Sequence, residues 1–241
     1  MSLAEEFAVR YAGLRQAYGT FTANNETRED GKASGKNITI SKELSDNDLL
    51  KLWEDHLSGH QSVGLVAIDE NNSCVWGAID VDEYDIDLKD LAIKVAKQKL
   101  PLILCRSKSG GAHLYIFLVE PVAASMLQRK LRQIAAAIGY GQTEIFPKQT
   151  QLLLDRGDRG STLNMPYFGG EHSTRYAYGK DGEVLSPQEF LNYAKELELS
   201  SSTLERLEAS PLNETLGWLD QAPPCIQHLA VQGFPKGSRN S

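Results

Sequence analysis

Asp80 and Asp82 stand at the end of the apolar run Trp76 to Asp82, and their spacing is the first sign of chemistry in this sequence. Alternate residues of a β-strand face the same side, so the two aspartates project together while Ile79 and Val81 face the other way. Two carboxylates on one strand face can hold Mg²⁺ or Mn²⁺, because these hard cations prefer oxygen ligands. The alternative is a strand that runs out into an acidic loop, and the same spacing also occurs in sugar-nucleotide transferases and surface loops.

A glycine-rich run from Arg106 to His113 is the second sign. Its Ser-Gly-Gly turn lets backbone N–H groups approach an anion, and cationic side chains beside it can neutralise phosphate. The run is not a Walker A loop, because no Gly-Lys-Ser/Thr ending opens a helix after it. It predicts a triphosphate site made of Arg106, Lys108, Ser109, Gly110 and Gly111. His113 begins the strand that follows and could donate to a phosphate oxygen; a buried structural histidine is the alternative.

A third carboxylate would complete a site for two divalent ions, in which one activates the attacking hydroxyl and the other supports the leaving phosphate. Glu144, Asp155 and Asp158 are the candidates. Glu144 is preferred because Glu144 to Phe146 is typical of a strand, which can aim a side chain firmly. Asp158 lies in a glycine-flanked turn, and Asp155 is the closer competitor.

Basic and aromatic side chains near these carboxylates complete the set of candidates. Lys148 and Arg159 are predicted to contact phosphates of a nucleotide or a template. Asn164 offers a further polar contact. Tyr167 and Phe168 offer a stacking surface, with core packing as an equal alternative.

The elements that must position these residues can be read from apolar periodicity. Helices are expected from the N-terminus through Leu14, at Ser45 to Leu57, Leu88 to Lys99 and Ala123 to Ile138, and from Pro187 onward. Strands are expected at Val63 to Asp69, Cys74 to Asp82, Leu102 to Cys105, His113 to Val119, Glu144 to Phe146, Gln151 to Leu154 and Thr174 to Tyr178. The first two strands are expected to form a hairpin, and the polar stretch Thr22 to Lys36 a flexible loop. This mixture predicts an α/β or α+β domain in which helices pack on a sheet.

Composition narrows the classes of function. The chain has 241 residues and a net charge of −7, but residues 101–180 hold ten Lys and Arg against five Asp and Glu, so positive charge gathers where the motifs lie. No apolar run reaches the roughly 18 residues that span a bilayer, and no signal pattern opens the chain, which predicts a cytoplasmic protein. Cys74, Cys105 and Cys225 form no CxxC pair, so no zinc site is expected.

Taken in order, the motifs resemble those of the archaeo-eukaryotic primase superfamily, and especially the primase-polymerases of phages, plasmids and related mobile elements. Its hhhDhD motif is similar to Gly77 to Asp82, and its small-x-His motif to Gly111 to His113. Glu144 to Gln149 and Leu163 to Phe168 resemble the third-motif region and the turn after it. The third acidic position is usually Asp in the superfamily and is Glu144 here. The tail Pro223 to Asn240 is similar to the opening of a helical domain that follows such cores.

The resemblance implies an RRM-like sheet flanked by an N-terminal αβ unit, with a helical C-terminal segment. Residues 1–185 would be the catalytic domain and residues 186–241 a helical extension that begins a downstream domain. The implied activity is template-directed transfer of a nucleotide onto a 3′-hydroxyl in DNA replication, with two Mg²⁺ or Mn²⁺ ions on Asp80, Asp82 and Glu144. The implied partners are a single-stranded DNA template, a primer strand and dNTPs or NTPs, with a helicase or helical domain downstream. A DxD glycosyltransferase and a metal-free RRM-like module that stacks bases on aromatics are the alternatives.

Overall fold

The computed structural model describes residues 1–27, 33–83 and 85–209. Cys225 and the tail that resembles a helical domain lie outside the described residues. Two antiparallel sheets make up the framework. The four-stranded sheet has the order β2-β1-β3-β8 and consists of β1 (Ala17–Thr27), β2 (Ala33–Ser41), β3 (Val63–Val66) and β8 (Thr162–Asn164). The six-stranded sheet has the order β10-β9-β5-β6-β4-β7 and consists of β4 (Ser73–Val81), β5 (Ile103–Arg106), β6 (Ala112–Ala123), β7 (Glu144–Phe146), β9 (Ala177–Tyr178) and β10 (Val184–Leu185).

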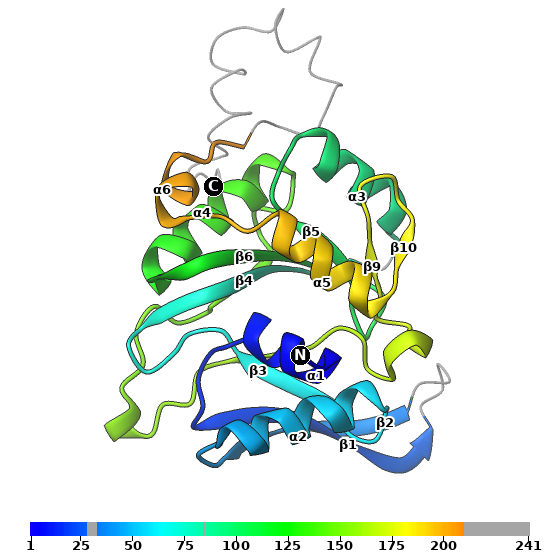
Figure 1. Cartoon of the computed structure of the whole chain (residues 1–241), viewed down its shortest axis with the longest axis vertical. Helices are drawn as coiled ribbons and strands as arrows, with labels where there is room; N and C mark the ends of the chain where they lie inside the picture. Colours follow the sequence, from blue (N-terminus) through cyan, green and yellow to red (C-terminus); the bar gives the residue numbers. More distant parts are fainter. Residues whose placement is uncertain (28–32, 84, 210–241) are drawn as a thin grey trace, which may run out of the picture.

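Helices cover both sheets and fill the space between them (Figure 1). The α-helices are α1 (Leu3–Arg10), α2 (Asp46–Leu57), α3 (Leu88–Lys97), α4 (Ala124–Ala137), α5 (Pro187–Glu196) and α6 (Ser201–Arg206), with short 3₁₀ turns η1 (Leu154–Arg156) and η2 (Gly170–His172). The predicted fold class, a mixed α/β chain with helices packed on sheets, is confirmed. Among the described residues, no helix has the length and apolarity needed to cross a membrane.

Helix α1 lies between the two sheets and anchors an aromatic cluster. It begins at Ser2, whose side chain accepts from the Glu5 N–H while the Glu5 carboxylate accepts from the Ser2 N–H. Phe7 packs against the Trp53 ring of α2, with ring centroids 4.9 Å apart. Tyr11, just after α1, meets Trp76 of β4 edge-on at 5.2 Å. The cluster therefore ties the N-terminal sheet to the inner face of the six-stranded sheet.

Helices α3 and α4 cover the other, outer face of the six-stranded sheet. Ile79 and Val81 of β4 are fully buried in this outer core, which includes Leu127 and Leu131 of α4. A Cβ at Gly77 would lie 2.8 Å from the Leu131 side chain, so the close approach of α4 to β4 requires glycine there. Because the outer side chains of β4 are held this way, its alternate residues must face the inner side.

Helix α5 begins at a capping box on Ser186 with Pro187 in its first turn. It buries Phe190 and Leu191 in the aromatic cluster between the sheets. The proposed division of the chain at residue 185 stays a prediction, and the described part of the extension packs on the core.

Three predictions about strands were wrong. Val63 to Asp69 and Cys74 to Asp82 do not form a hairpin: β3 pairs with β1 and β8, whereas β4 pairs with β6 and β7, so the turn between them leads from one sheet to the other. Thr22 to Lys36 is not one flexible loop, because β1 runs to Thr27 and β2 starts at Ala33. Gln151 to Leu154 is not a strand and leads into η1, while the strand of this region is β8.

His56 joins α2 to the four-stranded sheet and to the turn that follows β8. Its Nδ1 accepts from the Val63 N–H at 2.9 Å, and its Nε2 lies 2.8 Å from the Pro166 carbonyl oxygen, to which it donates. Burial lowers the pKa of His56 from 6.5 to about 4. The folded protein therefore holds a neutral imidazole that the unfolded chain would protonate below pH 6.5.

We expect this histidine to make the protein sensitive to acid. Its contribution to the free energy of unfolding is complete above pH 6.5 and declines as the pH falls towards 4, by about 3 kcal/mol at most. Urea unfolding at pH 7, 5.5 and 4 measures the loss, and His56→Gln should flatten the curve over this range. An unchanged pH dependence in His56→Gln would assign the loss to other groups.

Candidate active site

The inner face of the six-stranded sheet carries a row of polar side chains on three neighbouring strands. β4 lies between β6 and β7, and Asp80 of β4 stands opposite His113 on one side and Glu144 on the other. Residues opposite each other on antiparallel strands have Cβ atoms about 5 Å apart. Asp82 follows just after the end of β4. Strand register thus brings together Asp80, His113 and Glu144, which lie far apart in the sequence.

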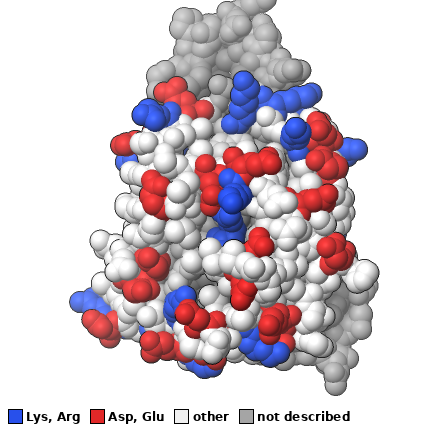
Figure 2. Space-filling view, viewed as in Figure 1, with Lys and Arg blue, Asp and Glu red and all other residues white. Residues whose placement is uncertain are grey.

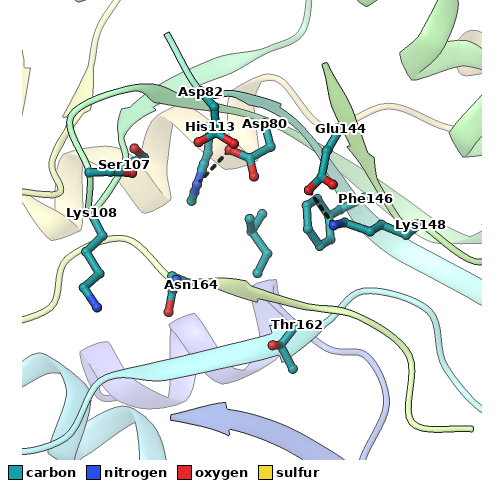
Figure 3. Close-up of a pocket in the computed structure, with 12 residues that line it drawn as sticks. Asp80, Asp82, Ser107, Lys108, His113, Glu144, Phe146, Lys148, Thr162 and Asn164 are labelled. Atoms are coloured by element: carbon teal, nitrogen blue, oxygen red, sulfur yellow. Dashed lines mark ion pairs between the residues drawn. The ribbon is translucent and has the colours of Figure 1, made fainter. Parts of the chain in front are cut away.

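These residues face a cavity of about 190 Å³ between the two sheets (Figure 3). Figure 3 shows Asp80, Asp82 and His113 projecting from one side of the cavity and Asn164 and Thr162 from the other. The lining residues are Asp80, Asp82, Ser107, Lys108, Ser109, His113, Glu144, Phe146, Lys148, Thr162, Leu163 and Asn164. The pocket is open and mostly polar in its lining, which suits a charged ligand.

The carboxylates repel one another across this cavity. Asp82 is exposed, but partial desolvation, followed by the negative charges of Asp80 and Glu144, raises its pKa. The Oδ1 atom of Asp80 is buried without a hydrogen-bond donor among the described residues, although His113 Nε2 lies 3.3 Å from it. The two atoms are close enough for an ion pair, but the ring N–H is not aligned with the oxygen as a hydrogen bond requires, so the contact is weak. An orphaned carboxylate oxygen in a set of oxygen donors fits Mg²⁺ or Mn²⁺.

Glu144 is neutralised within the protein by Lys148, with which it forms an ion pair. The Lys148 ammonium also lies 5.0 Å from the centre of the Phe146 ring. Within residues 1–27, 33–83 and 85–209, no three carboxylate, histidine or cysteine side chains meet closely enough to ligate one ion. Glu144 would therefore have to turn from Lys148 to share an ion with Asp80 and Asp82.

Tyr115 contacts the ring nitrogen of His113 that does not face Asp80. The Nδ1 atom of His113 lies 3.1 Å from the hydroxyl of Tyr115, and that hydroxyl donates to the carbonyl oxygen of Asn164 at 3.3 Å. His113 is 7% exposed, so it is a buried side chain whose Nε2 is turned to the carboxylate row. Tyr115 lies two residues along β6 and shares the inner face, as strand alternation requires.

The loop between β5 and β6 forms the end of the cavity at Lys108. Its Ser107 N–H donates to Gly111 and its Gly110 N–H to Ser107, so these two N–H groups serve the turn itself. The turn needs glycine at Gly110, where φ is 104°. Lys108 reaches across to the Phe21 ring of β1, 2.9 Å from its centre. The loop thus offers an anion the side chains of Ser107 and Lys108.

The structure places the other predicted residues outside the cavity lining. The Arg106 guanidinium donates to the Thr174 carbonyl and lies close to Gly110. The Arg159 guanidinium donates to the Leu154 and Asp158 carbonyls. Neither Asp155 nor Asp158 lines the cavity, whereas Glu144 does. Four lining residues were not predicted from the sequence, namely Ser107, Phe146, Thr162 and Leu163. Alternation along β7 would have found Phe146, but the last two lie on β8, which the sequence did not reveal.

The face of the molecule shown in Figure 2 carries acidic and basic side chains interspersed, with no broad area of one sign. The positive charge of the middle of the sequence therefore does not form a basic surface on this face. Two cationic side chains, Lys108 and Lys148, line the cavity itself.

Comparisons with known proteins identify the family of the chain. A family model described as the archaeo-eukaryotic primase domain of the TOTE conflict system matches residues 5–199. The polymerase domain of ligase D from Mycobacterium tuberculosis, in complex with DNA, is 15% identical, with 95% of this chain and 90% of that chain covered and a TM-score of 0.36. No curated protein matches the chain.

The resemblance to primases is confirmed at the level of the superfamily, and the phage or plasmid type stays a prediction. Polymerases of this superfamily generally use divalent metal ions. The family model covers most of the chain, including both sheets and the whole cavity lining. The chain therefore belongs to the family described as the archaeo-eukaryotic primase domain of TOTE conflict systems.

Proposed function

We propose that the chain is a DNA primase or DNA polymerase that transfers a nucleotide from a dNTP or NTP onto a 3′-hydroxyl, directed by a single-stranded template. Family membership supports nucleotidyl transfer at the level of the superfamily. The observation that carries the proposal is the row in which Asp80 stands between His113 and Glu144, with Asp82 in the same cavity. A role in DNA replication, a primer strand and a downstream helicase are part of the proposal.

In this mechanism Asp80, Asp82 and Glu144 would hold two Mg²⁺ or Mn²⁺ ions. Such ions activate the attacking hydroxyl and neutralise the leaving phosphate. The protein itself contributes position and charge, since phosphoryl transfer needs little else from side chains. Nε2 of His113 and the Lys108 ammonium face the cavity where the triphosphate would lie. Ser109 of the β5–β6 loop also lines it. Gly110 and Gly111 shape that loop.

Two other functions could use parts of the same site. A DxD glycosyltransferase would use the same aspartates, but it gives no role to His113 opposite Asp80. A metal-free RRM-like module would stack bases on exposed aromatics. Tyr167 is 1% exposed and packs within the core, so it offers no stacking surface.

Synthesis on a single-stranded DNA template tests the proposal. The assay uses labelled dNTPs or NTPs, with and without an annealed primer, in Mg²⁺ and in Mn²⁺, and a parallel reaction with a labelled UDP-sugar. Template-dependent products in either metal are expected. Sugar transfer would establish the glycosyltransferase, and binding of DNA without any synthesis would support the RRM-like module.

His113→Ala is expected to act mainly by weakening the affinity for nucleotide, with the fold kept. A lost charge-assisted hydrogen bond is worth about 1.5–3 kcal/mol, or roughly 10- to 150-fold in the dNTP dissociation constant. Tyr115→Phe removes the hydroxyl behind His113 and should give a smaller change in the same direction. A dNTP titration of each variant is the measurement. A His113→Ala variant that titrates like the wild type would leave His113 a structural residue.

A further inference from the structure

Lys148 is a cation that lies at the carboxylate end of the cavity. Its ammonium forms an ion pair with Glu144 and lies 5.0 Å from the centre of the buried Phe146 ring (Figure 3). Its charge also lowers the pKa of Asp82, against the larger effects of desolvation and of the neighbouring carboxylates, which raise it. Lys148 is therefore a countercharge to more than one of the carboxylates proposed to hold metal.

The backbone at Lys148 is fixed, whereas its side chain is partly exposed. Gln128 Nε2 donates to the carbonyl oxygens of Pro147 at 2.9 Å and of Lys148 at 2.8 Å, so α4 holds the chain just after β7. The side chain of Lys148 is 35% exposed and that of Glu144 is 56% exposed. Exposed ion pairs are weak, because water and other ions compete for both partners. The Lys148 ammonium can therefore change its partner while its backbone stays in place.

The charge balance of the cavity limits how many divalent ions it can take. Three carboxylates line it, and with the Lys148 ammonium paired to one of them their net charge is −2. One divalent cation neutralises this charge. A second one, added while Lys148 stays in place, would leave an excess of positive charge at short range, which is unfavourable. The second ion therefore needs an anion to enter with it, or Lys148 to leave Glu144.

A nucleoside triphosphate meets both needs. It brings negative charge, and its oxygens are strong alternative acceptors for an ammonium group. Lys148 lines the cavity, so its side chain can meet a ligand there. Once Lys148 has turned away, Glu144 is free to ligate an ion together with Asp80, which stands opposite it in the sheet. Nucleotide and second ion then favour each other's binding, and by linkage the effect is equal in both directions.

We propose that Lys148 is a movable countercharge that pairs with Glu144 in the free protein and releases it to the second divalent ion when a nucleoside triphosphate enters. This inference rests on the proposed function and adds an order of binding to it. The free protein holds one ion, and the second binds together with the nucleotide. Lys148 acts through Glu144 and is a positioning residue. The arrangement prevents the site from carrying both ions before a substrate is present.

Binding of Mn²⁺ without primer or template tests the inference. Free Mn²⁺ is counted from its EPR signal during a titration, alone and with saturating α,β-imido dATP, an analogue that is not incorporated. The variants are Lys148→Met, which keeps the length of the side chain and removes its charge, and Lys148→Arg. The matched control is Lys94→Met, because Lys94 of α3 forms an ion pair of the same spacing with Asp90, at 2.7 Å, outside the cavity lining.

The wild type should bind one Mn²⁺ alone and a second with the nucleotide, with a coupling of about tenfold or more. Lys148→Met should bind the second ion without nucleotide, about 5- to 20-fold more tightly than the wild type, and its coupling should fall below about threefold. Lys148→Arg and Lys94→Met should keep the coupling of the wild type. Adding Glu144→Gln to Lys148→Met should remove the gain, because the two side chains act as a pair.

Three results would overturn the inference: two ions bound to the free wild type, equal Mn²⁺ titrations of the wild type and Lys148→Met without nucleotide, or a gain that persists after Glu144→Gln. Weaker nucleotide binding by Lys148→Met with an unchanged ion count would make Lys148 a phosphate contact alone. Failure of the proposed function looks different, since the coupling would then depend on Lys148 while the wild type synthesises no DNA.

Discussion

Asp80→Asn is expected to abolish nucleotide incorporation while the protein stays folded, and Asp82→Asn should do the same. Each change removes one carboxylate from the set proposed to hold the metal ions and keeps the size of the side chain. Loss of a group that stabilises developing charge costs about 3–4 kcal/mol or more in the activation free energy, which is at least about 100-fold in rate. This is the largest effect we expect from any single substitution in the chain.

The fold should tolerate these changes, because the carboxylates do not stabilise the metal-free protein. Asp80 Oδ1 has no hydrogen-bond donor among the described residues, and the pKa of Asp82 is raised by partial desolvation and by its acidic neighbours. Removing one negative charge therefore relieves repulsion. Thermal unfolding should show a Tm within a few degrees of the wild type, and titration with Mn²⁺ should show weaker binding.

Asp85→Asn provides the matched control. Asp85 is an exposed acidic residue a few positions after the pair, and it does not line the cavity. Its variant should keep normal synthesis and normal Mn²⁺ binding, which would separate the metal site from a general effect of acidic charge after β4. Normal synthesis by Asp80→Asn would remove the basis of the proposed mechanism.

The sequence predicted which residues line the cavity better than it predicted the strand pairing. Asp80 and Asp82 share a face because alternation is a local property of a strand, and His113 follows a recognisable turn. Glu144 is preferred as the third carboxylate for a local reason too, because Glu144 to Phe146 is typical of a strand. That Asp80 stands directly between His113 and Glu144 depends on the register of β4 with β6 and β7, which packing against α4 fixes. No pattern within one strand contains that information.

The errors also have physical causes. The turn after β3 shows that the chain reverses but not which strands then pair, so a hairpin was expected where the chain changes sheet. The polar composition of Thr22 to Lys36 indicates a loop, yet β1 and β2 pair there through backbone hydrogen bonds that need no apolar side chains.

Glu144 raises a separate question, because the structure pairs it with Lys148 instead of turning it fully to the aspartates. An ion that binds between Asp80 and Glu144 must compete with the Lys148 ammonium. Asp155 is exposed on η1, and Asp158 accepts from the Leu153 N–H at 2.9 Å within its own turn. Both of these aspartates are outside the cavity lining, so neither can replace Glu144 without a movement of the loop.

Glu144→Gln is therefore expected to lower the rate of incorporation by about 100-fold and to shift the metal titration to higher concentration, because it removes a charge proposed to hold an ion. Asp155→Asn and Asp158→Asn keep size and remove charge in the same way, and both should leave the rate and the metal titration near those of the wild type. Primer extension across a Mn²⁺ and a Mg²⁺ series measures both quantities for all three variants. If Glu144→Gln keeps wild-type turnover and metal dependence while Asp155→Asn loses both, the third ligand is Asp155, and the loop that carries η1 must close over the cavity during the reaction.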